Sequence, residues 1–146
     1  MNTMADKKRR KMADKADRHK LYEKSVQCVE AEIDFVDDTF RQLRNRVPGI
    51  LREDFCGTTN TSCEWVKRRP GNIAHCVDND TEVLEWGRKN KIAKLKNGAA
   101  GRIHIHEADV LKVETPPADM VLAMNFSYWL FKTRPLMKKY FKRVHR

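Results

Sequence analysis

The stretch REDFCGTTNTSCEW, residues 52–65, lies between a short apolar run and a segment with a helical pattern. Glu53 and Asp54 stand directly before a turn that contains a single glycine, Gly57. Glycine-containing turns between a strand and a helix commonly bind phosphate groups. Two carboxylates before such a turn would repel a phosphate, so this stretch indicates a different ligand.

Charge is distributed unevenly along the 146 residues, whose formal net charge is +10. Residues 1–20 carry +5 and residues 132–146 carry +7, whereas residues 21–131 carry −2. Basic ends favour a polyanion. An exposed basic helix face and a solvated tail account for the same charges, so nucleic acid is a partner that the sequence allows without favouring it. The length fits one domain with its own core.

The chain has no apolar run near the roughly 18 residues that a membrane span needs, and no apolar segment of a secretory signal follows its basic N-terminus. We therefore predict no membrane partner. The sequence contains four cysteines, Cys28, Cys56, Cys63 and Cys76. Their irregular spacing without a C-x-x-C pair is typical of reduced thiols in a cytoplasmic protein, rather than of a disulfide framework or a zinc site.

The apolar pattern and the turn signals predict alternating strands and helices. The predicted helices span residues 21–46, 59–69, 79–95 and 133–146, and the predicted strands span 50–55, 72–78, 102–110 and 120–126. This alternation predicts an α/β, doubly wound Rossmann-like fold with a mostly parallel sheet. Residues 1–18 have few large apolar side chains, so we predict a basic disordered tail followed by one domain over 19–146.

Two histidines, His104 and His106, alternate with isoleucines in the third predicted strand and so point to one face. A metal pair would fit this spacing, but we interpret it as a half-exposed edge strand and predict no metal site. The predicted strands end in polar residues, Asp54, Asp78, Asp109 and Asn125. Ligands of parallel sheets bind beyond the carboxyl ends of the strands, so these residues predict a site there.

The turn at Gly57 does not suit a dinucleotide, which needs a G-x-G-x-x-G pattern so that the backbone can approach a pyrophosphate. Asp78 follows Gly57 by 21 residues, a suitable place for a carboxylate that accepts hydrogen bonds from ribose hydroxyls. A nucleoside without phosphates and with a positive group nearby meets both conditions. S-adenosylmethionine is such a cofactor, since it joins adenosine to an ammonium and a sulfonium group.

The sequence resembles class I S-adenosylmethionine-dependent methyltransferases in several motifs. LREDFCGTTNTSCEWVKRRPGNIAHCVDND, residues 51–80, resembles their first two motifs. EADV at 107–110 resembles the adenine-loop motif, and DMVLAMNFSYWLF at 119–131 resembles the fourth motif. LYEKSVQ at 21–27, taken with LREDFCGT at 51–58, is similar to a bacterial-type group of these enzymes.

This resemblance implies a set of cofactor-binding residues. In chain order they are Tyr22, Gln27, Asp54, Cys56, Gly57, Thr58, Asp78, Asn79, Asp109, Val110, Asn125 and Phe126. Tyr22 and Gln27 would close the pocket. The residues that would line the methionine end are Asp54, Cys56, Gly57 and Thr58, and Asp78 would hold the ribose. The adenine would be contacted by Asn79, Asp109 and Val110. Asn125 and Phe126 would lie beside the reactive methyl group. Capping or turn roles for the three aspartates, and surface positions for the first pair, remain alternatives.

The resemblance covers about residues 20–146 and ends with the fourth strand and its helix, so the sheet would lack the family's last three strands. The implied function is methyl transfer to an unknown acceptor, with no catalytic base assigned. A non-catalytic cofactor-binding fragment or module and a basic nucleic-acid-interacting protein are the alternatives. The fourth strand, 120–126, would present a bare edge, which predicts self-association there. A continuation of this chain is the alternative that would satisfy the same backbone groups.

Overall fold

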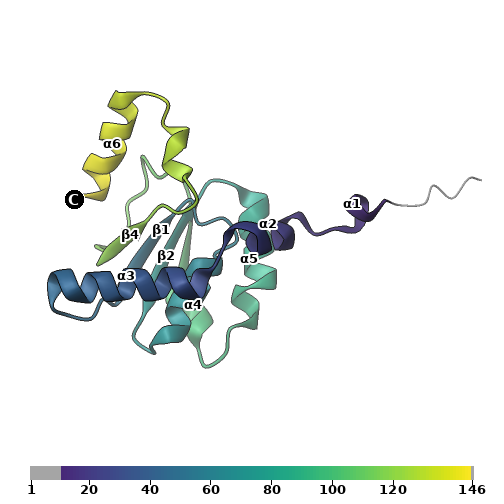
Figure 1. Ribbon diagram of the computed structural model, residues 1–146, viewed down its shortest axis with the longest axis horizontal. Coiled ribbons are helices and arrows are strands. Elements are labelled where there is room, and N and C mark those ends of the chain that lie inside the picture. Colours follow the sequence, from purple (N-terminus) through teal and green to yellow (C-terminus); the bar gives the residue numbers. More distant parts are fainter. Residues whose placement is uncertain (1–10, 146) are drawn as a thin grey trace, which may run out of the picture.

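The computed structural model describes residues 11–145. Residues 1–10 of the predicted tail lie outside this range, so disorder in the tail stays a prediction. The next residues form a short exposed helix, α1 (Met12–Lys15), which projects away from the rest of the chain (Figure 1). Asp17 and Arg18 already contact the domain, because Asp17 accepts a hydrogen bond from the Trp86 indole and Arg18 pairs with Glu82.

A parallel sheet of four strands forms the centre of the fold, with helices on both of its faces. The strands are β1 (Ile50–Asp54), β2 (Ile73–Asp78), β3 (Ile103–Glu107) and β4 (Met120–Leu122). The longer helices are α2 (Arg18–Val26), α3 (Val29–Arg44), α4 (Asn60–Arg68), α5 (Thr81–Asn90) and α6 (Arg134–Val144). Short 3₁₀ turns occupy Ile92–Lys94, Ala99–Arg102 and Ser127–Leu130.

The strand order is β3-β2-β1-β4, and every pairing is parallel. Chain order runs outward from β1 to β3 and then returns to β4 on the other side of β1. The switch point of this doubly wound sheet therefore lies between β1 and β4. The predicted α/β fold is confirmed, and so is the edge position of β3.

The first face of the sheet carries the apolar core. Leu51 and Ala74 pack there against Trp65 of α4, Ile33 of α3 and Leu84 of α5, all of them almost fully buried. The Trp65 indole N–H also donates to the Ile73 carbonyl, 3.0 Å away, so this large side chain is buried with its polar atom paired. Three helices thus close this face of the sheet (Figure 1).

The second face is more polar. It is covered by α6 and by the segment from residue 108 to 118, which meet in a smaller apolar cluster. The buried members of that cluster are Val77, Val110, Val113, Phe131 and Tyr140. Helix α6 lies apart from α3, α4 and α5 in Figure 1, on the other side of the strands.

Three predicted elements differ from the structure. The helix predicted over 79–95 ends at Asn90, and a separate 3₁₀ turn follows it. The helix predicted over 21–46 is two helices, because Gln27 and Cys28 leave the helical conformation between α2 and α3. The strand predicted over 120–126 ends at Leu122, and Asn125 and Phe126 then adopt left-handed φ angles of 55° and 59°, which no strand accommodates. The apolar character of 120–126 therefore reflects packing of a loop as well as of a strand.

Candidate functional site

Strained backbone gathers at the switch point of the sheet. Phe55 and Thr59 follow β1 with φ angles of 58° and 63°, and Asn125 and Phe126 follow the neighbouring strand β4 with 55° and 59°. The left-handed conformation costs a non-glycine residue on the order of 1 kcal/mol or more. Such strain is typical of functional sites, so it marks the carboxyl ends of β1 and β4 as the candidate site.

Two backbone N–H groups of the turn after β1 donate hydrogen bonds to the end of β2. The Cys56 N–H donates to the Val77 carbonyl (3.0 Å), and the Gly57 N–H donates to Oδ2 of Asp78 (2.8 Å). The other oxygen, Oδ1, accepts the Asp80 N–H at 3.0 Å. Asp78 is half-buried, and each of its oxygens keeps a free lone pair, so the carboxylate can still accept hydrogen bonds from a ligand.

Two glycines, one in the turn and one in a neighbouring helix, shape this turn. Gly57 has a φ of 53°, and a Cβ on it would meet open space, so the backbone there is accessible. A Cβ on Gly87 of α5 would lie 2.6 Å from the Thr58 carbonyl oxygen, so helix and turn approach too closely for any side chain. Gly87 is a residue that the sequence analysis missed, since an isolated glycine in a helical pattern gives no such signal.

The Glu53 carboxyl group has its hydrogen-bond partners inside the protein. Its Oε2 accepts the backbone N–H of Ser62 (3.1 Å) and the Ser62 hydroxyl (2.5 Å), so the carboxyl group caps the first turn of α4. The side chain is buried, and this burial raises its pKa to about 7. The acid at the start of the turn therefore stabilises a helix.

Asp54 is fully buried and also has partners inside the chain. Oδ1 accepts from Nε of Arg52 (2.7 Å), and Oδ2 accepts from the Tyr140 hydroxyl of α6 (2.8 Å). Burial, together with the negative charge of Asp54, raises the pKa of the Tyr140 phenol. These contacts explain the two carboxylates without a cationic ligand, so contact of Asp54 with the cofactor stays a prediction.

Helix α2 docks onto the same turn through a residue that the sequence analysis missed, Glu23. Its Oε1 accepts from the Thr58 hydroxyl (2.6 Å), and its Oε2 pairs with Nζ of Lys91 at the end of α5 (2.5 Å). Gln27, a predicted site residue, accepts from the Asn60 side chain (2.9 Å). Tyr22 is half-exposed. No sequence signal identifies Glu23, because its burial depends on where α2 lies.

The remaining predicted site residues lie around this centre. Asn79 is exposed at the end of β2, and Val110 is buried beside Asp109, whose side chain accepts the Leu111 N–H (2.8 Å) in a tight turn. Asn125 and Phe126 are exposed, and Phe126 packs on Trp129 with ring centroids 5.1 Å apart.

The ends of β2 and β3 are joined, because the Ala108 N–H donates to the Asp78 carbonyl at 2.9 Å. The structure thus brings together the predicted residues of the turn, Asp78 and the start of the 108–118 segment. The Asn125–Phe126 pair follows the adjacent strand β4.

Within residues 11–145, no three His, Cys, Asp or Glu side chains are arranged to hold a metal ion. His104 is exposed and His106 half-buried on the edge strand β3, as expected for a half-exposed strand. None of the helices in this part of the chain has the length and apolarity needed to cross a membrane.

The architecture matches solved proteins of one kind. The structure of CalS10, an amino pentose methyltransferase from Micromonospora echinaspora, matches with a TM-score of 0.68 and 16% identity over 86% of this chain and 49% of that chain. The fold is that of the S-adenosylmethionine-dependent methyltransferases. The sugar N-methyltransferase KedS8 from Streptoalloteichus sp ATCC 53650 matches this methyltransferase fold with a TM-score of 0.69 and 17% identity, over 88% of this chain and 48% of that chain.

The plantazolicin methyltransferase BpumL matches with a TM-score of 0.66 and 12% identity, over 85% of this chain and 46% of that chain. The present chain therefore spans about half the length of these solved methyltransferases. No protein-family model and no curated protein matches the sequence. The predicted resemblance is confirmed at the level of the methyltransferase fold.

Proposed function

We propose that this chain binds S-adenosylmethionine and takes part in methyl transfer. The observation that carries the proposal is the half-buried Asp78 carboxylate, fixed at the end of β2 beside an open single-glycine turn. Related folds support it, since CalS10 was solved with bound S-adenosylmethionine and BpumL with S-adenosylhomocysteine.

The residues at the strand ends fit this cofactor. Asp78 would accept the ribose hydroxyls, and the adenine would lie between Asn79 and the Asp109–Val110 turn. The methionine end would lie at Gly57 and Thr58, beneath α2.

When bound, the cofactor would supply an electrophilic methyl carbon. The chain's own contribution is then to position that carbon and exclude water, because direct displacement by a good nucleophile depends mainly on proximity and alignment. Asn125 and Phe126, strained at the end of β4, would flank the acceptor. We assign no catalytic base, and the acceptor class stays open.

The binding proposal is tested by calorimetry with S-adenosylmethionine and S-adenosylhomocysteine. Asp78→Ala should weaken binding by about 1.5–3 kcal/mol, the usual value of a charge-assisted hydrogen bond. Glu85→Ala, which removes an exposed acid from α5, is the matched control and should leave affinity unchanged. Failure of the wild-type chain to bind either compound would refute the proposal, and equal affinity in Asp78→Ala would remove the ribose role.

A methyl-transfer screen with labelled cofactor distinguishes an enzyme from a non-catalytic cofactor-binding module. Incorporation of label into an acceptor supports the enzyme. Cofactor binding without transfer across amine, hydroxyl and peptide acceptors favours the module.

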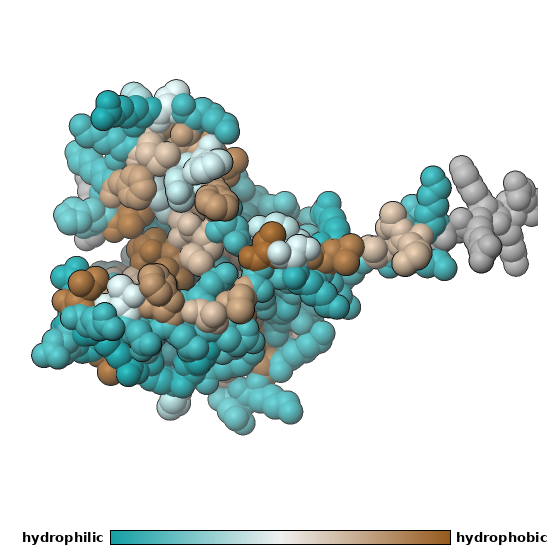
Figure 2. All heavy atoms as spheres, viewed as in Figure 1, coloured by the Kyte–Doolittle hydropathy of each residue, from teal (hydrophilic) through white to brown (hydrophobic). Residues whose placement is uncertain are grey.

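We further propose self-association of two copies along β4. Among the described residues, β4 pairs with β1 on one side alone. A groove of about 290 Å³ lies between this strand and α3, and Phe35 and Leu43 on its rim are 70% and 76% exposed. Figure 2 shows apolar side chains gathered along α3 and in the hollow between α3 and α6. A second β4 would satisfy the open backbone groups and cover this surface.

Sedimentation of the wild type at low and high salt tests the association. Phe35→Glu with Leu43→Glu should produce a monomer without loss of folding, because both side chains are exposed. A wild type that is monomeric at high concentration under both conditions would contradict the proposal.

We propose a reducing compartment such as the cytoplasm. All four cysteines are free thiols, and three of them are buried. Contact with Cys76 and burial raise the pKa of the Cys56 thiol, and burial raises that of Cys63 to about 12. Protonated, buried thiols act as small apolar side chains and are poor partners for disulfide exchange.

A further inference from the structure

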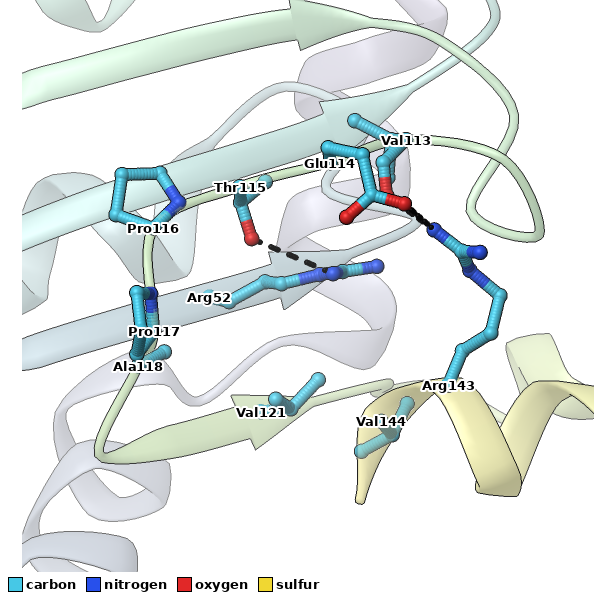
Figure 3. Close-up of a pocket in the computed structure, with 10 residues that line it drawn as sticks. All are labelled: Arg52, Val113, Glu114, Thr115, Pro116, Pro117, Ala118, Val121, Arg143 and Val144. Atoms are coloured by element: carbon cyan, nitrogen blue, oxygen red, sulfur yellow. Dashed lines mark hydrogen bonds and ion pairs between the residues drawn. The ribbon is translucent and has the colours of Figure 1, made fainter. Parts of the chain in front are cut away.

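A cavity of about 230 Å³ lies on the second face of the sheet, under the segment that leads from residue 113 to β4 (Figure 3). Arg52 of β1, Val121 of β4 and Arg143 of α6 reach it from three separate elements, and Thr115 lines it from above. Its volume is below the about 300–1,000 Å³ of pockets for drug-sized ligands, so it suits a small molecule.

The Arg52 guanidinium has N–H donors at this cavity that lack a close hydrogen-bond partner. Its side chain is only 9% exposed, and its Nε and Nη2 donate to Asp54 (2.7 and 3.3 Å). Nη1 has a weaker contact, with the Thr115 hydroxyl at 3.4 Å. A guanidinium has five N–H donors, so the Nη1 end of this buried group is incompletely satisfied where it faces the cavity.

Arg143 has a similar deficit. Its Nη2 donates to the Val113 carbonyl (2.7 Å) and to Oε1 of Glu114 (2.9 Å), as Figure 3 shows for the Glu114 contact. Its Nε is buried and has no hydrogen-bond partner among the described residues. The Glu114 side chain is 88% exposed, so its ion pair with Arg143 contributes little and is easily exchanged.

We propose that this cavity binds the carboxylate of a small organic acid between Arg52 and Arg143. Planar carboxylates match guanidinium groups in geometry and charge, and they would satisfy donors that are costly to leave unpaired. The remaining walls are apolar, from Val121, Val144 and Pro116, and suit a short aliphatic body. The Glu114 carboxylate pairs with Arg143 at the position where the ligand's carboxylate would bind. The proposal does not depend on cofactor binding.

The test is an NMR titration of the full chain with 2-methylpropanoate up to about 10 mM, which would fill a site with a millimolar dissociation constant. Saturable shifts are expected for the amides of residues 113–118. Arg143→Gln should weaken binding about tenfold or more, the loss typical of a charge-assisted hydrogen bond. Glu114→Gln should strengthen it, because the internal carboxylate no longer competes.

Lys139→Gln removes one positive charge from an exposed position on α6 and should bind as the wild type does. Arg52 is left unchanged because its loss would also leave the buried Asp54 without its ion-pair partner. The neutral isostere 2-methylpropanamide should not bind. Equal binding by Arg143→Gln and wild type, equal binding of the amide, or saturable binding of inorganic phosphate alone would each overturn the proposal.

Discussion

The two faces of the sheet are built in different ways. On the first face, Leu51, Ala74 and Cys76 are fully buried against three helices, and almost every contact is apolar. On the second face, Arg52 and His75 lie opposite each other in neighbouring strands, and their side chains turn toward polar partners. The difference shows that the first face stabilises the fold through buried area, whereas the second depends on particular pairs of polar groups.

The polar pairs of the second face come from distant parts of the chain. Tyr140 reaches Asp54 across 86 residues, and His75 contacts His106 across 31 residues at 3.1 Å. His104 stacks on His75 with ring centroids 5.1 Å apart. Each such pair contributes less to the free energy of unfolding than a large buried side chain does. Removing one partner leaves the other without its hydrogen bond, so the contribution of the pair is lost.

The largest effect is expected on the first face. Trp65→Ala removes a fully buried ring and its hydrogen bond to Ile73, so the free energy of unfolding should fall by about 3–5 kcal/mol. Trp129→Ala, at a 61% exposed position, is the matched control and should change it by less than about 0.5 kcal/mol. Urea unfolding measures both. A similar cost for the two variants would contradict the assignment of the core.

Glu53 is the exception on the first face and should make that face sensitive to pH. Burial raises its pKa from 4.5 to about 7, so the folded state binds the proton more tightly than the unfolded state does. The stability linked to the proton is complete below pH 4.5 and is lost as the pH rises to 7 and beyond. Glu53→Gln should therefore stabilise the protein at pH 8 by about 2–3 kcal/mol.

The measurement is urea unfolding of wild type and Glu53→Gln at several pH values. Glu85→Gln, at an exposed position of α5, is the control. An unchanged pH profile in Glu53→Gln would show that folding does not raise the pKa of this carboxyl group.

On the second face, Tyr140→Phe removes the hydroxyl that donates to Oδ2 of Asp54. This buried oxygen then keeps only the longer bond from Nη2 of Arg52, at 3.3 Å. We expect a loss of about 1–3 kcal/mol in thermal or urea unfolding. Phe141→Ala, on the exposed side of the same helix, should cost less. If Tyr140→Phe is neutral, α6 does not depend on this bond for its position.

The smallest expected effect comes from the histidines of the second face, and its sign is opposite to that of Glu53. Burial, and then the neighbouring His104 and Arg52, lower the pKa of both His75 and His106 below 6.5. The unfolded state then binds more protons, so the stability present above pH 6.5 is lost as the pH falls through the lowered pKa values. His75→Gln with His106→Gln should flatten this part of the profile.

This comparison is best made in the Glu53→Gln background, where the opposing titration is absent. His145→Gln, an exposed position after α6, should leave the slope unchanged. A double variant with an unaltered slope between pH 5 and 7 would show that the histidine cluster does not couple protonation to folding.

Sequence alone determined the order of elements and the parallel sheet, and it predicts a site at the carboxyl ends of the strands. Strands 50–54 and 73–78 and helix 81–90 follow from local signals: apolar runs, turn residues and a capping aspartate, Asp80, whose side chain does accept the first N–H groups of α5. Asp78 and Gly57 could be singled out because the spacing between a turn and a strand-end acid is a local property of a β-α-β unit.

Tertiary structure alone decided which polar groups meet. The break between α2 and α3, the burial of Glu23 against Thr58 and the capping of α4 by Glu53 depend on how separate elements dock. The same holds for the Asp54–Tyr140 bond and for the two arginines at one cavity. A sequence pattern reports period and local preference, but the partner of a buried charge is fixed by three-dimensional proximity, which the order of residues does not contain.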